Sequence, residues 1–369
     1  MQAYNKYTSM DNWCNAVIAK RHKIPQPIAT FPAAYVLGST VERLSKDPVG
    51  QAIGIKLMAE KYNMRIAMGY MDLSAEAEAF GATCIYHEHE IPTISGALVT
   101  SEEEADALQI PEVGTGRTGS YLKGIEMALT LINDRPVFAE CIGPFSLAGR
   151  LVDITEAMVL CYEEPDMMHT VLDKATTFII NYIKAYKALG AHGVMVAEPL
   201  AGILSPALVG EFSCDYMKKI VEECQDKNFV VFYHNCGNNT VFQAEEIFSI
   251  GCKGYHFGDK IRLRDILEKA PSDVIVMGNV SPSEEFLGGT KASIRKATYR
   301  VMHDCYDFDN FWLSSGCDVP ALTDPAQLDE FYAAAEDYYK CHDMLESLEG
   351  DFDIADIYAR FGVTMGMEF

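Results

Sequence analysis

From about residue 64 onward, short runs of apolar and β-branched residues alternate with longer segments of helical periodicity. This alternation favours a parallel sheet whose strands are joined by helices. The eight strand-like runs are Met64–Tyr70, Thr83–Tyr86, Pro136–Ile142, Gly193–Ala197, Phe229–Tyr233, Gly254–Phe257, Asp273–Met277 and Phe311–Ser314. Eight strands predict an α/β fold of the closed (β/α)8 TIM barrel type rather than an open doubly wound sheet. No Gly-x-Gly-x-x-Gly follows the first run, which disfavours a dinucleotide-binding fold.

The chain has 369 residues, which is enough for two average domains or for one barrel with an extension. No repeat, low-complexity segment or Ser/Pro-rich linker divides it. We therefore expect residues 1–369 to form a single barrel domain. Residues 1–63 precede the regular alternation and contain Pro25, Pro27 and Pro32, so they are interpreted as an N-terminal extension packed on the barrel.

Acidic residues outnumber basic ones by 53 to 30, and the net charge is -23. This balance disfavours a nucleic-acid surface and a polybasic membrane anchor. No apolar stretch approaches the ~20 residues of a transmembrane helix, and the first residues contain no apolar run typical of a secretory leader. The 11 cysteines are scattered and odd in number, so thiols or metal ligands in a reducing cytoplasm are expected rather than disulfides.

Polar side chains follow several of the predicted strands at the point where each strand ends. In a barrel, these ends form one face, where the active sites of such folds lie. We call this face the mouth of the barrel. The residues expected to point into it are Glu140, Glu198, His234, Cys236, Asp259, Asn279 and Cys317.

The most informative of these residues are a histidine and a cysteine two positions apart. His234 and Cys236 follow an apolar strand, and residues i and i+2 of an extended chain point the same way. Imidazole and thiolate together suit zinc. Cys317 directly follows the last strand and supplies a third ligand, which leaves one position open, as in catalytic zinc sites. The alternative is that Cys236 and Cys317 are ordinary buried thiols.

Several segments together resemble a known superfamily. They are Gly143–Gly149, Glu198–Pro199 with Ile203–Pro206, His234–Gly237, Met277–Pro282 and Ser315–Cys317. They resemble the uroporphyrinogen decarboxylase superfamily and, within it, the zinc-dependent methylcobamide:thiol methyltransferases such as those acting on coenzyme M. The His-x-Cys and the later Cys separate these methyltransferases from the decarboxylases.

This resemblance implies a barrel in which His234, Cys236 and Cys317 bind zinc. It also implies a methylcorrinoid co-substrate on a separate carrier protein, because the chain has no Asp-x-His-x-x-Gly corrinoid motif. The small-molecule methyl acceptor would be a thiol such as coenzyme M, or tetrahydrofolate. Arg150 stands where relatives usually carry an apolar residue, and Ser315 stands where a proline is common.

Glu198, Asp259 and Asn279 are the predicted catalytic residues. Glu198 ends the strand before the one that carries His234, so it could fill the open zinc position or orient a ligand. A salt bridge to a neighbouring Lys or Arg is the equally weighted alternative for this carboxylate.

Two other functions compete with methyl transfer. A decarboxylase acting on uroporphyrinogen needs cationic side chains against several substrate carboxylates. The stretch where those enzymes place paired arginines reads Ile24–Pro25–Gln26–Pro27–Ile28, which fits poorly. A non-catalytic zinc- or corrinoid-binding protein of the same fold is the other alternative.

Overall fold

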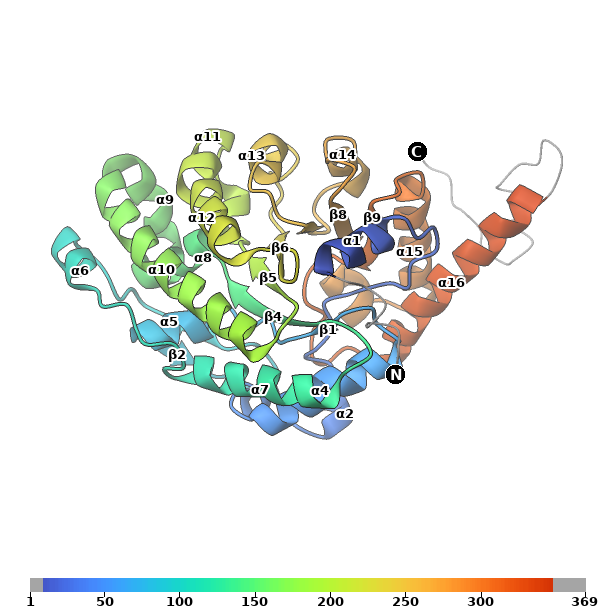
Figure 1. Cartoon of the computed structure of the whole chain (residues 1–369), viewed down its shortest axis with the longest axis horizontal. Helices are drawn as coiled ribbons and strands as arrows, with labels where there is room; N and C mark the ends of the chain where they lie inside the picture. Colours follow the sequence, from blue (N-terminus) through green and yellow to red (C-terminus); the bar gives the residue numbers. More distant parts are fainter. Residues whose placement is uncertain (1–8, 348–369) are drawn as a thin grey trace.

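Seven parallel strands form the centre of the molecule in the computed structural model, which describes residues 9–347 (Figure 1). The strands, in the order in which neighbours pair, are β1 (Ala67–Met68), β4 (Val137–Ile142), β5 (Gly193–Ala197), β6 (Val230–Asn235), β7 (Gly254–Phe257), β8 (Ile275–Val280) and β9 (Phe311–Ser315). Every pairing in this sheet is parallel. The order follows the sequence, as expected when each strand is followed by a helical connection to the next.

Helices surround the sheet and lie along its outside (Figure 1). The α-helices are α1 (Met10–Ile18), α2 (Ala33–Leu37), α3 (Val41–Leu44), α4 (Pro48–Lys61), α5 (Ala75–Phe80), α6 (Glu102–Ala107), α7 (Arg117–Leu131), α8 (Pro144–Val152), α9 (Ile154–Glu163), α10 (Pro165–Leu189), α11 (Pro206–Val209), α12 (Asp215–Cys224), α13 (Ala244–Phe248), α14 (Leu263–Leu267), α15 (Lys291–Cys305) and α16 (Pro325–Ser347). Shorter turns of other helical types are η1 (Leu200–Ile203), η2 (Gly210–Cys214) and η3 (Pro282–Leu287). The predicted TIM-barrel class is confirmed.

One of the eight predicted barrel strands is wrong. Residues 83–85 do form a strand, β2 (Thr83–Ile85), but it pairs antiparallel with β3 (Thr93–Ser95) in a separate two-stranded sheet. Thr83 and Ile85 are exposed, whereas each of the seven parallel strands is buried along its whole length. Strands of a barrel wall are covered on both faces, whereas two of the three residues of β2 are exposed, so β2 does not belong to the wall.

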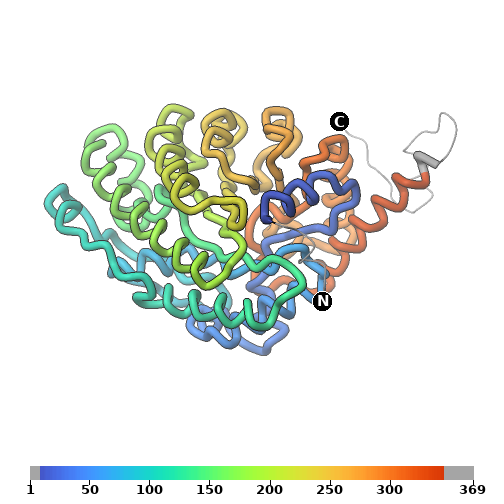
Figure 2. Tube along the Cα trace, in the orientation of Figure 1, coloured from blue at the N-terminus to red at the C-terminus, as the bar shows by residue number. Residues whose placement is uncertain are grey.

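The eighth position in the barrel is taken by residues 24–30, which we call the closing segment. It lies between β9 and β1, so the blue start of the chain runs beside its red end (Figure 2). The Gln26 N–H donates to the Leu313 carbonyl of β9 over 2.9 Å. On the other side, the Gln26 amide exchanges two hydrogen bonds with the Ile66 backbone, and the Thr30 hydroxyl donates to the Met68 carbonyl of β1.

Side chains replace backbone groups in this closure because Pro25 and Pro27 have no N–H to donate. The Gln26 side chain supplies one donor and one acceptor to Ile66, as a paired strand residue would. Part of the 1–63 extension is therefore built into the barrel wall.

The interior of the barrel is filled by large side chains from the inward-facing positions of the strands. Helix α1 packs against the end where the strands begin, and the Trp13 ring lies 6.4 Å from that of Phe138 and 6.1 Å from that of Trp312. Backbone N–H groups of Met10 and Asp11 donate to the Lys227 carbonyl just before β6. This packing blocks that end of the barrel and leaves the mouth as the end open to chemistry.

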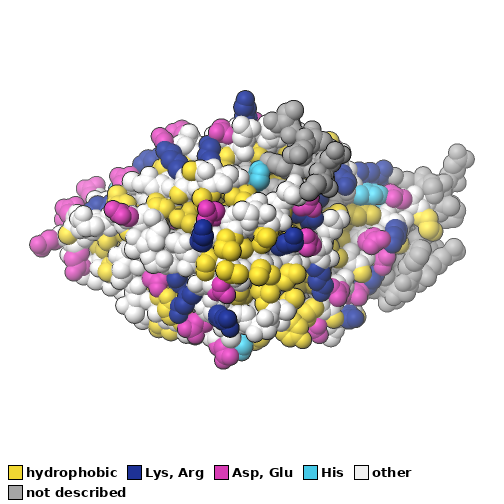
Figure 3. All heavy atoms as spheres, turned by 60° about the horizontal axis from the view of Figure 1, so that its bottom comes forward, with side chains coloured by type: hydrophobic (Ala, Val, Ile, Leu, Met, Phe, Trp, Pro, Cys, Tyr) yellow, Lys and Arg dark blue, Asp and Glu magenta, His cyan; other side chains and the backbone are white. Residues whose placement is uncertain are grey.

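The surface agrees with the acidic composition. On the face over α2, α4 and α7, Lys and Arg side chains are interspersed with Asp and Glu, and apolar side chains gather near the centre (Figure 3). Exposed apolar residues on α2 and α4 include Tyr35, Val36 and Val49. Within residues 9–347, no helix is both long and apolar enough to cross a bilayer. All 11 cysteines are free thiols, as predicted.

Candidate metal centre

The three predicted metal ligands lie together at the mouth. His234 is the fifth residue of β6, Cys236 follows that strand directly, and Cys317 lies two residues beyond the end of β9. One ligand atom from each side chain can be chosen so that all lie within 4.8 Å of one another. Cys317 Sγ is 3.5 Å from His234 Nε2. In the described part of the chain, this is the one such convergence of three His, Cys, Asp or Glu side chains.

Two glycines let the strand ends come this close. A Cβ on Gly258, just after β7, would lie 2.6 Å from the Cα of Cys236. A Cβ on Gly316 would lie 2.7 Å from the backbone nitrogen of Asp259. Any side chain at either position would push apart the segments that carry the two cysteines. The glycines therefore belong to the construction of the centre.

The two thiols share their protons unequally. The thiol of Cys317 hydrogen-bonds to Cys236 and lowers the pKa of Cys236 to about 4, and the His234 ring acts in the same direction. The same interaction raises the pKa of Cys317 well above its ordinary value, and burial adds to this. Two sulfur atoms and one ring nitrogen then converge, and the lowered pKa of Cys236 favours a thiolate there, which is a donor set that a borderline-soft cation prefers.

A second histidine, His256, contacts His234 on the side away from Cys317 and is not among the residues predicted from the sequence. His256 on β7 is paired in register with His234, and their Nδ1 atoms are 2.8 Å apart. His256 Nε2 is 2.8 Å from the Ser314 hydroxyl, which donates to the Gln26 carbonyl over 2.8 Å. The sequence does indicate its position. His256 lies between Tyr255 and Phe257 in a predicted strand, and because side chains alternate along a strand, His256 points into the barrel when those two rings point outward.

Glu198 does not join the three ligands. One of its oxygens accepts a hydrogen bond from the Phe145 N–H over 2.8 Å, and the other accepts from the N–H and hydroxyl of Ser146. These donors form the start of α8, where a carboxylate is favoured by the helix dipole. Burial raises the pKa of Glu198 to about 7, although the three hydrogen bonds lower it. Its first role is to fix α8 to the end of β5, and an influence on the metal centre stays a prediction.

Replacing Glu198 by glutamine should destabilise the protein. A glutamine amide has one acceptor oxygen, so its NH2 group would face the backbone N–H of Phe145 or of Ser146. Leaving a buried donor without an acceptor costs about 1–3 kcal/mol of unfolding free energy. Urea unfolding would measure the loss. Glu163→Gln on the exposed side of α9 is the matched control, with a change within about 0.5 kcal/mol. Equal stabilities of the two variants would contradict this role.

Asp259 and Asn279 lie beside the centre and line a hollow of about 560 Å³ with Lys260 and Arg300. Asn279 donates from its amide to the carbonyls of Gly258 and Ile261, and so holds the loop after β7. Asp259 is 3.2 Å from the Lys260 ammonium. Both residues are at the mouth, and their catalytic roles stay predictions.

Two further carboxylates at the mouth have oxygens without a partner. Both oxygens of Glu140 on β4 are buried and unpaired among the described residues, and so is Oδ1 of Asp318, next to Cys317. Burial raises the pKa of Glu140 well above its ordinary value, and Asp318 adds to this. Arg150 is mostly buried and donates from Nε to the Leu73 carbonyl over 2.6 Å. Burial raises the pKa of Asp318 in the same way, so the buried carboxyl groups of Glu140 and Asp318 are both favoured in the protonated, neutral form.

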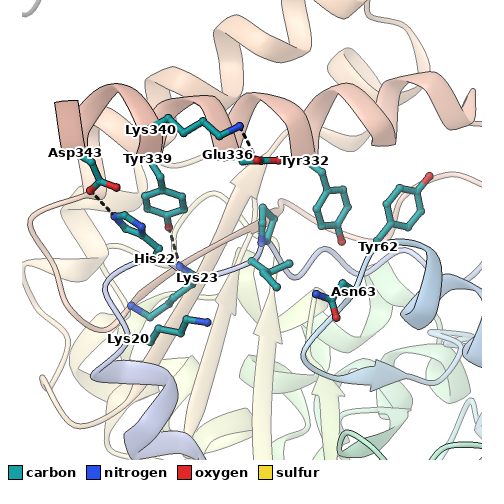
Figure 4. Close-up of a pocket in the computed structure, with 12 residues that line it drawn as sticks. Lys20, His22, Lys23, Tyr62, Asn63, Tyr332, Glu336, Tyr339, Lys340 and Asp343 are labelled. Carbon is teal, nitrogen blue, oxygen red and sulfur yellow. Dashed lines mark hydrogen bonds and ion pairs between the residues drawn. The ribbon is translucent and has the colours of Figure 1, made fainter. Parts of the chain in front are cut away.

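A hollow of about 480 Å³ lies at the opposite end of the barrel, where the strands begin (Figure 4). There the His22 ring stacks on Tyr339, and the Tyr62 ring stacks on Tyr332. The Lys23 ammonium donates to the Asp309 carbonyl. These contacts join α16 to the residues around the closing segment. Among residues 9–347, no thiol lines this hollow, so it lacks the ligand set found at the mouth.

A family model described as uroporphyrinogen decarboxylase (URO-D) matches residues 33–338. The chain belongs to the uroporphyrinogen decarboxylase family. Among its relatives, the uroporphyrinogen decarboxylase of Alcanivorax borkumensis is 24% identical over 288 residues, which cover 74% of this chain and 79% of the relative. That of Psychromonas ingrahamii is 26% identical over 255 residues, which cover 66% and 70%. The predicted superfamily is confirmed.

Two solved structures share the fold of this family member. A methyltransferase from Methanosarcina mazei matches with a TM-score of 0.78 and 20% identity, over 90% of this chain and all of that one. A B12-independent methionine synthase from Shewanella sp. W3-18-1 matches with a TM-score of 0.54 and 12% identity, over 81% and 90%. At these identities the likeness shows a common fold.

Proposed function

We propose that this member of the uroporphyrinogen decarboxylase family is a zinc-dependent methyltransferase. It would move a methyl group from a methylated corrinoid to a thiol such as coenzyme M, or to another acceptor such as tetrahydrofolate. The observation that carries the proposal is the convergence of His234, Cys236 and Cys317 at the mouth. Three side-chain ligands leave a fourth position for an exchangeable group, as in catalytic zinc sites.

The donor set fits zinc in its chemistry. Cys236 is held as a thiolate, and His234 has one ring nitrogen engaged by His256, so the other faces the two sulfurs. Zinc bound there would lower the pKa of an acceptor thiol, whose ordinary value is about 8.5. The protein's own part is to hold the three ligands at strand ends, with His234 buried and the two cysteines partly open to an incoming ligand. His234 is 1% exposed.

The transfer step is a displacement at carbon. A thiol acceptor would first lose its proton to solvent, and the resulting thiolate would then attack the methyl carbon in line. The bond from carbon to cobalt would break, and its electron pair would stay with the cobalt of the corrinoid. Atoms and electrons balance without any further oxidant or reductant.

A separate carrier protein would bring the corrinoid to the mouth. Exposed apolar residues in the connections that follow strand ends support this partner. Ile203 follows β5, Phe242 follows β6, Leu287 follows β8 and Leu322 follows β9, and they are 47–74% exposed. Apolar groups that surround a site in this way are typical of a surface that another protein covers.

The competing activity is decarboxylation of uroporphyrinogen, the activity named for the relatives in sequence. A substrate with several carboxylates needs cations around it, whereas the interior of the mouth holds the carboxyl groups of Glu140 and Asp318, with oxygens that lack a hydrogen-bond partner among the described residues. Where paired arginines are expected in that activity, Gln26 instead closes the barrel. These observations favour methyl transfer.

The test is to measure the metal content of the purified protein and then the loss of methylcobalamin absorbance in the presence of coenzyme M, other thiols or tetrahydrofolate. We expect about one zinc per chain and acceptor-dependent demethylation, with free methylcobalamin a poor substitute for the carrier. Zinc without demethylation by any acceptor would favour a non-catalytic binding protein. Release of carbon dioxide from uroporphyrinogen would favour the decarboxylase.

A further inference from the structure

We propose that His256 is a positioning residue of the metal centre, which fixes His234 as the tautomer that can ligate a metal through Nε2. The inference rests on the metal site of the proposed function and adds the group that prepares it. His256 lies on β7 and is fully buried. It contacts Nδ1 of His234, whereas Cys317 lies beside Nε2, the other ring nitrogen of His234.

The hydrogen bonds set the direction of the protons. The Ser314 hydroxyl donates its one hydrogen to the Gln26 carbonyl, so toward His256 its oxygen can only accept. His256 therefore carries its hydrogen on Nε2. A neutral imidazole with hydrogen on Nε2 has a lone pair on Nδ1. Since the two Nδ1 atoms are 2.8 Å apart, the hydrogen between them belongs to His234.

These hydrogen bonds fix the orientation of the His234 ring and leave the lone pair on its Nε2 atom. With its hydrogen on Nδ1, the Nε2 atom is unprotonated and lies 3.5 Å from Cys317 Sγ, on the side where the sulfurs converge. The opposite tautomer would place a hydrogen at the metal position and bring two lone pairs together at the Nδ1 contact. An orienting partner on the second nitrogen of a histidine ligand commonly contributes 10–100-fold to metal affinity.

The relay begins on the closing segment. The first acceptor in this chain of hydrogen bonds is the Gln26 carbonyl, and the Gln26 side chain also completes the barrel wall. The hydrogen-bond direction at His234 therefore depends on the closing segment being in place, through Ser314 and His256.

The experiment compares two substitutions of His256. His256→Met keeps the approximate volume and removes both hydrogen bonds, so zinc affinity measured by chelator competition should fall about 10–100-fold. His256→Gln offers an acceptor to His234 and a donor to Ser314, so affinity should return to within a few-fold of wild type. Met195→Ala, a buried change on β5 inside the barrel, is the control that loosens the core without touching the relay.

A second readout needs no metal. In zinc-free protein with 15N-labelled histidine, the His234 ring should be the Nδ1–H tautomer in wild type and in His256→Gln, and a mixture in His256→Met. Unchanged zinc affinity and tautomer in His256→Met would overturn the positioning role while leaving the proposed function intact. If the wild-type protein shows this tautomer but binds no zinc, the positioning of His234 by His256 would stand and the proposed zinc-dependent methyl transfer would be refuted.

Discussion

Cys317→Ser should abolish acceptor-dependent demethylation of methylcobalamin, with a loss of at least about 10³-fold, while the protein stays folded. The substitution replaces one of only two sulfur ligands by a hydroxyl, which binds zinc poorly at neutral pH. Loss of the metal removes several kcal/mol of transition-state stabilisation, and about 4 kcal/mol corresponds to a factor of 10³. Zinc content and initial rates with coenzyme M would be measured on the same preparation.

The matched control is Cys84→Ser, which changes a half-buried thiol that is not among the three converging ligands. It should keep full zinc content and full rate. The fold should survive Cys317→Ser because a barrel of this size is stabilised by its apolar core and does not require a metal to fold. Full zinc occupancy in Cys317→Ser would show that the metal is held elsewhere and would refute the three-ligand centre.

Gln26→Ala should lower the free energy of unfolding by about 2–5 kcal/mol. The Gln26 side chain is buried and satisfies both the N–H and the carbonyl of Ile66, which are themselves buried. Each group left without a partner costs about 1–3 kcal/mol, and the cavity left by the missing side chain adds to this. Denaturant unfolding followed by circular dichroism would measure the change.

Gln109→Ala serves as the control, because that glutamine is exposed and bonds only to the nearby Ala107 carbonyl. Its effect should be within about 0.5 kcal/mol. Gln26→Glu should be at least as destabilising as Gln26→Ala, because it places a buried carboxylate oxygen, which cannot donate, against the Ile66 carbonyl. A Gln26→Ala variant as stable as the control would mean that water replaces the side chain and that the closing segment contributes little.

Much of the barrel could be predicted because its strands are buried on both faces and so leave long apolar runs in the sequence. The convergence of the three candidate metal ligands was predictable for a related reason. His234 and Cys236 sit at the end of such a run, and Cys317 follows another, so the parallel topology alone brings them to one face.

The closing segment could not be predicted from strand patterns. Its prolines remove the backbone donors by which a strand is recognised, and a glutamine side chain makes the contacts instead. Thr83–Tyr86 has the composition of a strand and is predicted as one of the eight, yet it pairs with β3 outside the barrel and its residues Thr83 and Ile85 are exposed. The Glu198 contacts with α8 depend on where a side chain turns at a strand end, which spacing does not specify.

The closing segment also bears on how the protein is made. Gln26 leaves the ribosome early, but its partner Ser314 lies 288 positions further along the chain. At ~5–20 residues per second, roughly 15–60 s pass between the two. During that interval the nascent chain holds an unclosed sheet, with the Ile66 backbone at one edge and no β9 at the other. The metal ligand on β6 is then already present while Cys317 and the start of its histidine relay are still missing. A chain released before β9 is translated would therefore expose a strand edge and an incomplete candidate metal centre together.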